Sequence, residues 1–314
     1  MRKEMKKIIM TILALALMAG ASAQTTKEDF QRRYQNLVDR VGAGGIGVEP
    51  LLIKWEAAFP EDLNMLEAKF SYYLQKSVTP TIIILSQDRY LGREPVVPLK
   101  DSTGRSVNYF EDYQYSDSLF ALAGSALDKA ISIAPSRFDY RLAKTNSYIG
   151  YEKESPDMAL QYILGIVAYN YSSKPEWTYP GMEKVDNEVF CALIQDCCYS
   201  FFRIGSPFSQ EAFRQLSEEM LLYNKDNPLF LDNMGSYWLV AKRDSKKALK
   251  YYNKVLKKHP DDLTAIRNCI LLARNDKNIK LEKKYLPMLV KYGETENDRN
   301  SAKARLTALS LMEK

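Results

Sequence analysis

Residues that could take part in catalysis are few in this chain and stand far apart. The 314 residues include a single histidine, His259, placed directly before Pro260 at the predicted end of a helix. A polar or positive group favours the negative end of the helix dipole, so a structural role is sufficient for His259. One histidine excludes a multi-histidine metal site and offers no nucleophile–histidine–carboxylate pattern. We therefore predict no metal, no cofactor and no catalytic residue, and a protein that is not an enzyme.

The sequence matches one nucleotide-binding fingerprint, and only formally. Residues 42–47, GAGGIG, have the GxGxxG spacing of loops that hold phosphate groups. Such a loop needs a strand before it and a helix start after it within a βαβ unit, whereas a predicted helix precedes this one. We interpret it as a turn between helices. A pair of carboxylates, as in glycosidases, would meet only in space, so a carboxylate-based enzyme stays open as an alternative.

The four cysteines have spacings that argue against disulfides. Cys191, Cys197 and Cys198 fall on one predicted helix, where separations of one, six and seven residues do not meet disulfide geometry. Cys269 belongs to a later helix. We expect free, buried thiols that act as small apolar side chains.

The elements that would position these residues are helices with a recurring pattern. Apolar or small residues follow one another in steps of four and three, and a proline comes five residues later. The copies of this pattern are Val48-Leu52-Trp55-Pro60, Ala123-Leu127-Ala130-Pro135 and Ala248-Tyr252-Val255-Pro260. The steps place the residues on one helix face, and proline ends each helix.

Residues 228–262 resemble a tetratricopeptide (TPR) unit. Leu231, Met234, Gly235 and Trp238 form one helix face, and the 248–260 pattern forms the next. Pro228 and Pro260 are 32 residues apart, close to the TPR period of about 34. The resemblance implies an all-α, right-handed α-α superhelix, a TPR-like solenoid, in which Gly235 and Ala248 let two helices approach closely. One residue more than usual separates Asn233 from Ala248.

The domain organisation follows from these patterns. Pro80, Pro95 and Pro98 forbid a continuous helix over 78–113, and strands are expected at 96–99 and 106–110 around a polar turn. We predict a signal peptide (1–23), N-terminal TPR-like helices (24–77), a loop or small β-hairpin insertion (78–113), and helical repeats with a C-terminal cap (114–314).

The first residues have the composition of an export signal. A basic start precedes an apolar run over 8–18, and Ala21-Ser22-Ala23 supplies small residues for cleavage after Ala23. The run is short for a membrane span, which needs about 20 residues. We expect a periplasmic or secreted protein with no transmembrane segment in the mature chain. The signal, the divergent repeats and the hairpin together look like secreted TPR proteins of the Bacteroidetes.

The formal net charge of the whole chain is +5, and basic residues gather in its C-terminal part. Such a surface could meet an anionic partner, or its lysines could simply solvate the outer helices. The export signal argues against nucleic acid as a partner.

Aromatic side chains are expected mainly between helices. We assign Trp55, Phe70, Trp238 and Tyr252 to the core, and expect Tyr72, Trp177 and Tyr179 to be freer. TPR stacks bind partners through a groove lined by the first helix of each pair. That family trait places Glu67, Tyr72, Gln75, Asp232, Ser236, Thr264, Arg267 and Arg274 in the partner-binding groove. These residues differ from the lysine and asparagine clamp of TPRs that hold acidic peptide termini.

The sequence therefore predicts an exported, non-enzymatic scaffold that mediates protein–protein interaction in the cell envelope. Its partner would be a protein or peptide. The alternatives are a glycan-binding accessory protein and a carboxylate-based enzyme. Exposed coplanar aromatic rings would favour the glycan, and a carboxylate pair in a cleft would favour the enzyme.

Overall fold

A computed structural model describes residues 25–311 of the chain. The predicted signal peptide and its cleavage after Ala23 lie outside these residues. None of the helices within 25–311 has the length and apolar character needed to cross a membrane. The described residues form two compact units, one of residues 25–79 with 114–134, the other of 80–113 with 135–311.

The described part of the first unit, residues 25–79 and 114–134, contains four helices. They are α2 (Lys27–Val41), α3 (Val48–Ala58), α4 (Leu63–Ser77) and α5 (Asp117–Ile133). Trp55 is fully buried, stacks on Phe30 with 5.9 Å between ring centroids, and donates its indole N–H to Asp62 over 3.1 Å. Asp62 also caps the start of α4. Trp55 therefore lies in the core as predicted. Its buried indole N–H keeps a hydrogen-bond partner in Asp62.

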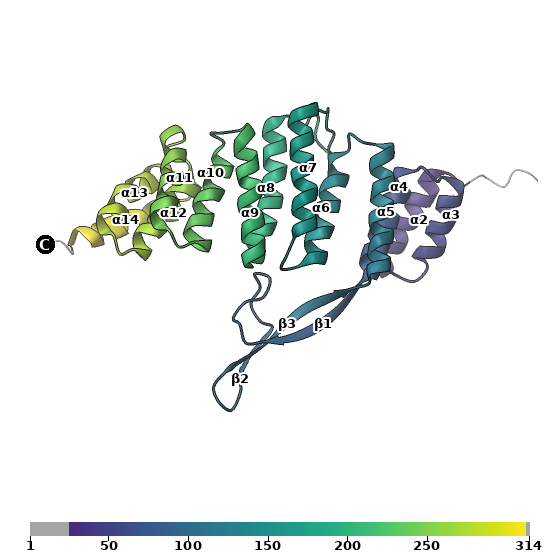
Figure 1. Ribbon diagram of the computed structural model, residues 1–314, viewed down its shortest axis with the longest axis horizontal. Coiled ribbons are helices and arrows are strands. Elements are labelled where there is room, and N and C mark those ends of the chain that lie inside the picture. The colour runs from purple at the N-terminus through teal and green to yellow at the C-terminus, as the bar shows by residue number, and fades with distance from the viewer. Residues whose placement is uncertain (1–24, 312–314) are drawn as a thin grey trace, which may run out of the picture. The chain divides into compact units, whose positions relative to one another are not determined.

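The second unit stacks helices in sequence order (Figure 1). They are α6 (Phe138–Glu152), α7 (Asp157–Ser173), α8 (Asn187–Ile204), α9 (Pro207–Tyr223), α10 (Pro228–Ser236), the π-helical turn η1 (Tyr237–Ala241), α11 (Ser245–Lys258), α12 (Leu263–Asn275), α13 (Ile279–Tyr292) and α14 (Glu296–Leu311). The pairs α6–α7, α8–α9, α10–α11 and α13–α14 pack as helical hairpins, which confirms the all-α fold class. Side-chain caps begin many of them, including Ser206 at α9.

A three-stranded sheet is inserted between α4 and α5. Its strands are β1 (Val78–Leu85), β2 (Val97–Lys100) and β3 (Ser106–Tyr115), in the order β1-β3-β2. Val97 pairs with Tyr109 and Lys100 with Ser106 in an antiparallel register, which confirms the predicted hairpin. The strand β1 was not predicted, because Pro80 suggested a break; proline is compatible with a strand at the edge of a sheet.

The π-helical turn absorbs the extra residue noted between Asn233 and Ala248. The N–H of Lys242 donates to the carbonyl of Tyr237 over 3.2 Å, an i to i+5 bond that widens the helix by one residue. Gly235 comes before this turn, and a β-carbon on it would lie 2.4 Å from a ring atom of Tyr252. The close approach predicted at Gly235 is therefore made by Tyr252. Ala248, which lies on α11 with Tyr252, is fully buried.

Candidate partner-binding site

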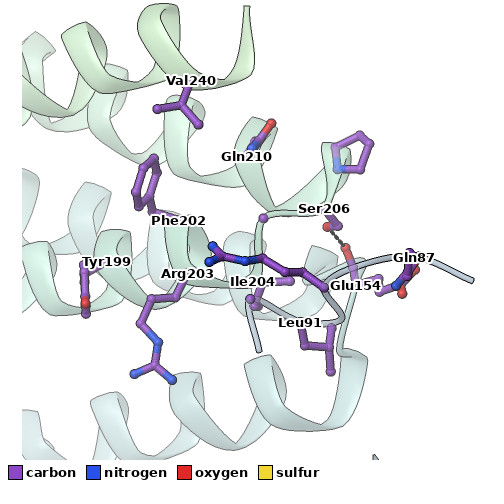
Figure 2. Close-up of a pocket in the computed structure, with 14 residues that line it drawn as sticks. Gln87, Leu91, Glu154, Tyr199, Phe202, Arg203, Ile204, Ser206, Gln210 and Val240 are labelled. Carbon is purple, nitrogen blue, oxygen red and sulfur yellow. Dashed lines mark hydrogen bonds between the residues drawn. The ribbon is translucent and has the colours of Figure 1, made fainter. Parts of the chain in front are cut away.

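A cavity of about 550 Å³ lies in the second unit where the loop after β1 meets the α8–α9 turn. We call it the hairpin cavity. Its walls come from residues 87–92 of that loop, from Glu154, from α8 and α9, and from Val240 on the π-helical turn. Figure 2 shows the Phe202, Gln210 and Val240 side chains on the helices that border it.

The loop is held against α8 by an unusually close backbone contact. A β-carbon on Gly92 would lie 1.8 Å from the carbonyl oxygen of Arg203, and the φ angle of Gly92 is +72°. Both facts require glycine here. Tyr90 and Arg93 close the turn around it with reciprocal backbone hydrogen bonds of 3.0 and 2.9 Å. The loop wall of the cavity thus depends on one glycine.

A buried ion pair fixes the sheet to the α6–α7 turn. The Lys153 ammonium lies 2.7 Å from the Asp112 carboxylate, and the Asp112 side chain is only 9 % exposed. The Tyr90 hydroxyl approaches the same carboxylate at 3.5 Å. Burial, followed by the charge of Asp112, raises the pKa of Tyr90 to about 12, so its hydroxyl keeps its proton.

The floor of the cavity is the turn between α8 and α9. Gly205, with a φ of +74°, ends α8, and Ser206 then caps α9 by accepting from the Ser209 N–H over 3.0 Å. The Ser206 hydroxyl also donates to the carbonyl of Glu154, the dashed line in Figure 2. One serine therefore joins the α6–α7 turn to the α8–α9 turn.

The chemistry of the lining is mixed. Leu91, Phe202, Ile204 and Val240 give apolar surface, and Tyr199 and Val240 are 57 % and 50 % exposed. Arg89 and Arg203 add positive charge. Arg89 is paired with Glu94 over 2.8 Å, whereas the Arg203 guanidinium lies 6.0 Å from the Tyr199 ring centroid. Such a surface suits an apolar side chain next to a negative group.

The predicted groove residues lie elsewhere, and several already have intramolecular roles. In the first unit, Glu67 is half-buried and Tyr72 is buried. The Gln75 side chain accepts the Gly44 N–H over 2.5 Å. Tyr72 is therefore not the freer aromatic residue that the sequence suggested. Trp177 is buried as well, in the second unit, where its indole N–H donates to Asn170 over 2.9 Å.

In the second unit, Asp232 is buried between helices instead of facing a groove. Burial, reinforced by the neighbouring Asp262 carboxylate, raises the pKa of Asp232 to about 8. Ser236 contacts the Tyr252 hydroxyl at 3.2 Å. These side chains act within the fold.

The remaining groove residues lie on α12. Arg267 is paired with Asp298 over 3.0 Å and Arg274 with Glu282 over 2.6 Å, while Thr264 is exposed. None of the eight predicted residues lines the hairpin cavity. The cavity could not be predicted from the sequence, because its loop wall, residues 87–92, has neither an apolar periodicity nor a motif. The one available signal was the length of the 78–113 insertion.

The cysteines are free and buried, as predicted. Burial raises the pKa of Cys197 to about 12 and that of Cys269 to about 12 as well. Their thiols remain protonated near neutral pH and act as apolar core groups. Residues 25–311 contain no cluster of three or more His, Cys, Asp or Glu side chains that could hold a metal ion.

The stacked helical hairpins define an all-α fold with a small inserted sheet. No protein-family model matches the chain, and no curated protein matches it. Among the solved structures that resemble this chain is one described as "Functional Characterization of Pseudomonas Aeruginosa pilF". The two share 10% identity and a TM-score of 0.36 over 88% of this chain and 96% of that one.

Proposed function

We propose that this protein is an exported, non-enzymatic scaffold that binds a protein partner through the hairpin cavity. The observation that carries the proposal is the cavity itself, in which apolar side chains and exposed arginines border one space of about 550 Å³. Its walls are fixed by Gly92, Ser206 and the Asp112–Lys153 ion pair, so little conformational entropy is lost when a ligand binds.

The ligand that fits this lining is a short peptide segment with an apolar or aromatic residue beside a carboxylate. Phe202 and Val240 offer contact area for the apolar group. The planar guanidinium of Arg203 can donate hydrogen bonds to a carboxylate. Arginine and aromatic residues commonly contribute most of the binding energy at interfaces. Thr264, exposed on α12 of the second unit, stays a candidate for further contact with a partner, and Glu67 stays a candidate for a separate contact on the first unit.

Export rests on the composition of residues 1–23, with cleavage after Ala23. The mature protein would then start at Gln24 and act in the periplasm or outside the cell. Mass spectrometry of the protein from its native source tests this, since a native mass that retains residues 1–23 would contradict export.

We do not extend the proposal to glycans, because Tyr72 and Trp177, two of the rings expected to be available, are buried. Carboxylates provide no better support for catalysis. Asp232 and Asp262 do interact, but Asp232 is 6 % exposed between packed helices and does not border the cavity.

Peptide-library selection against the purified protein tests the function. Enriched peptides should carry an acidic residue beside an apolar one, and Arg203→Glu should weaken their binding at least tenfold. Lys250→Glu makes the same charge change on the exposed face of α11, away from the cavity, and should leave affinity within about twofold. Equal affinities for the two variants would place binding outside the hairpin cavity.

A further inference from the structure

The strand β1 forms an edge of the inserted sheet, since the strand order is β1-β3-β2. Proteins usually protect such edges with charge, proline or shortness. The other edge, β2, is four residues long and carries Pro98 and Lys100. By contrast, residues 77–87, SVTPTIIILSQ, contain no charged side chain, and Thr81–Leu85 follow the single proline.

The direction of the β1 backbone groups follows from one hydrogen bond. Next to the start of β1 and the end of β3, the Ser116 N–H donates to the Ser77 carbonyl over 2.7 Å, so this carbonyl points toward the β3 side. At the other end the Asn108 side chain donates to the Gln87 carbonyl, so β1 and β3 run antiparallel. In an antiparallel ladder this direction alternates with every residue. Odd-numbered residues of β1 therefore face β3, while Pro80, Ile82 and Ile84 face the open edge. Pro80 agrees with this, because it has no N–H to give to β3.

The side chains at the same positions are apolar and exposed. Ile82 and Ile84 are 55 % and 56 % exposed and, two residues apart, lie on one face of the sheet. The edge thus combines free backbone donors and acceptors with unprotected β-branched side chains.

We propose that a second copy of this chain pairs with β1 in antiparallel orientation, centred on Ile83. In this register Ile82 of each copy lies opposite Ile84 of the other. These are the residues whose N–H and C=O groups face outward, so each such pair makes two backbone hydrogen bonds. The Ile83 residues meet on the two-fold axis as a non-hydrogen-bonded pair. Two sheets become one continuous six-stranded sheet.

The features of the edge favour a second copy over an unrelated strand. A two-fold pairing uses the same patch on both copies, so one sequence must satisfy both sides. The pattern Ile82-Ile83-Ile84 reads the same in both directions about its centre. Because the segment has no charge, no like-charge repulsion opposes the pairing, and the exposed isoleucines cover one another across the new strand pair.

Sedimentation equilibrium of the purified protein tests the pairing. A concentration-dependent mass of twice the chain is expected. Ile84→Lys adds a charge at the edge and should raise the dimer dissociation constant at least tenfold. Leu99→Lys makes the same change on β2, at a residue that is 49 % exposed, and should leave the constant within about twofold. A protein that stays monomeric, or equal effects of the two variants, would overturn the proposal.

Cysteine substitution checks the register. Non-hydrogen-bonded antiparallel pairs bring Cα atoms to about 4.5 Å, a spacing that disulfides accept. Ile83→Cys should therefore form a covalent dimer under mild oxidation, whereas Ile82→Cys should not, and the buried native thiols stay out of the reaction. A covalent dimer from Ile82→Cys in place of Ile83→Cys would show that the pairing is not centred on Ile83.

Discussion

Gly92 is the residue on which the shape of the hairpin cavity depends most directly. Its lack of a side chain allows the loop to touch the Arg203 carbonyl, and its positive φ allows the turn. Gly104, in the turn between β2 and β3, provides a matched comparison. Its φ is +84°, yet a β-carbon there would meet no atom within 4 Å.

We expect Gly104→Ala to cost only the backbone strain of a left-handed residue, about 1 kcal/mol. Gly92→Ala adds a clash with backbone and should release the loop from α8. Trypsin cleavage after Arg89 and Arg93 measures the release, and should be at least tenfold faster in Gly92→Ala than in Gly104→Ala. Equal cleavage rates would mean that the close contact does not hold the loop.

Asp232 predicts a pH effect whose sign follows from its raised pKa. The folded pKa is about 8, against about 3.9 for an unfolded aspartate. Between these values the folded protein holds a proton that the unfolded chain has lost. The free energy of unfolding therefore decreases as pH rises from about 4 to 8.

Asp232→Asn removes this titration and keeps the size of the side chain. At pH 8 the variant should be more stable than the wild type by roughly 2–5 kcal/mol, and the advantage should vanish near pH 4. Urea unfolding at several pH values measures the difference. Asp261→Asn, at an exposed position nearby, should follow the wild-type curve; a constant offset for Asp232→Asn across the pH range would contradict the argument.

At the scale of elements, the α10–α11 pair shows what periodicity could and could not predict. The apolar spacing located both helices and the burial of Leu231, Met234 and Ala248. The extra residue was visible in the sequence, but its accommodation as a π-helical turn was not. That outcome depends on how Tyr252 packs over Gly235, a three-dimensional contact that spacing alone does not encode.

The same limit applies to the candidate site. Residues on helix faces were assigned by analogy with a groove, yet Arg267 and Arg274 find carboxylates on α14 and α13. The hairpin cavity joins segments up to 153 residues apart in the sequence, from Gln87 to Val240. Periodicity describes neighbours along a helix and carries no information on where a loop will dock.

The α10–α11 contact gives a prediction of its own. In Gly235→Ala the added methyl would lie 2.4 Å from the Tyr252 ring, which is fully buried and cannot withdraw freely. We expect a loss of about 1–3 kcal/mol, the usual cost of overpacking. Gly124→Ala on α5, where a β-carbon meets nothing within 4 Å, should instead be neutral or slightly stabilising. A denaturant midpoint unchanged in Gly235→Ala would exclude the tight contact.

At the scale of the whole molecule, a stack of hairpins contacts mainly its neighbours, so its stability is a sum of local interfaces. The C-terminal cap illustrates this. Glu282 on α13 is 2 % exposed and lies between Arg305, with contacts of 2.9 Å, and Arg274 at 2.6 Å. Hydrogen bonds from these arginines, chiefly from Arg305, lower the pKa of Glu282. Both ion pairs of Glu282 therefore persist until strongly acidic pH.

Glu282→Gln should leave both arginines without their charge partner and loosen α12, α13 and α14. We expect about 1–3 kcal/mol of local destabilisation, since the arginines are 40–48 % exposed and can recover water. Hydrogen exchange resolves where the loss falls. Amides of α13 and α14 should exchange at least fivefold faster, while those of α8, separated from α13 by α10 and α12, keep the wild-type rate. Glu294→Gln, at an exposed position, should change neither. Faster exchange spread equally over α8 and α14 would show that the second unit unfolds as one cooperative block, and the nearest-neighbour description of the stack would fail.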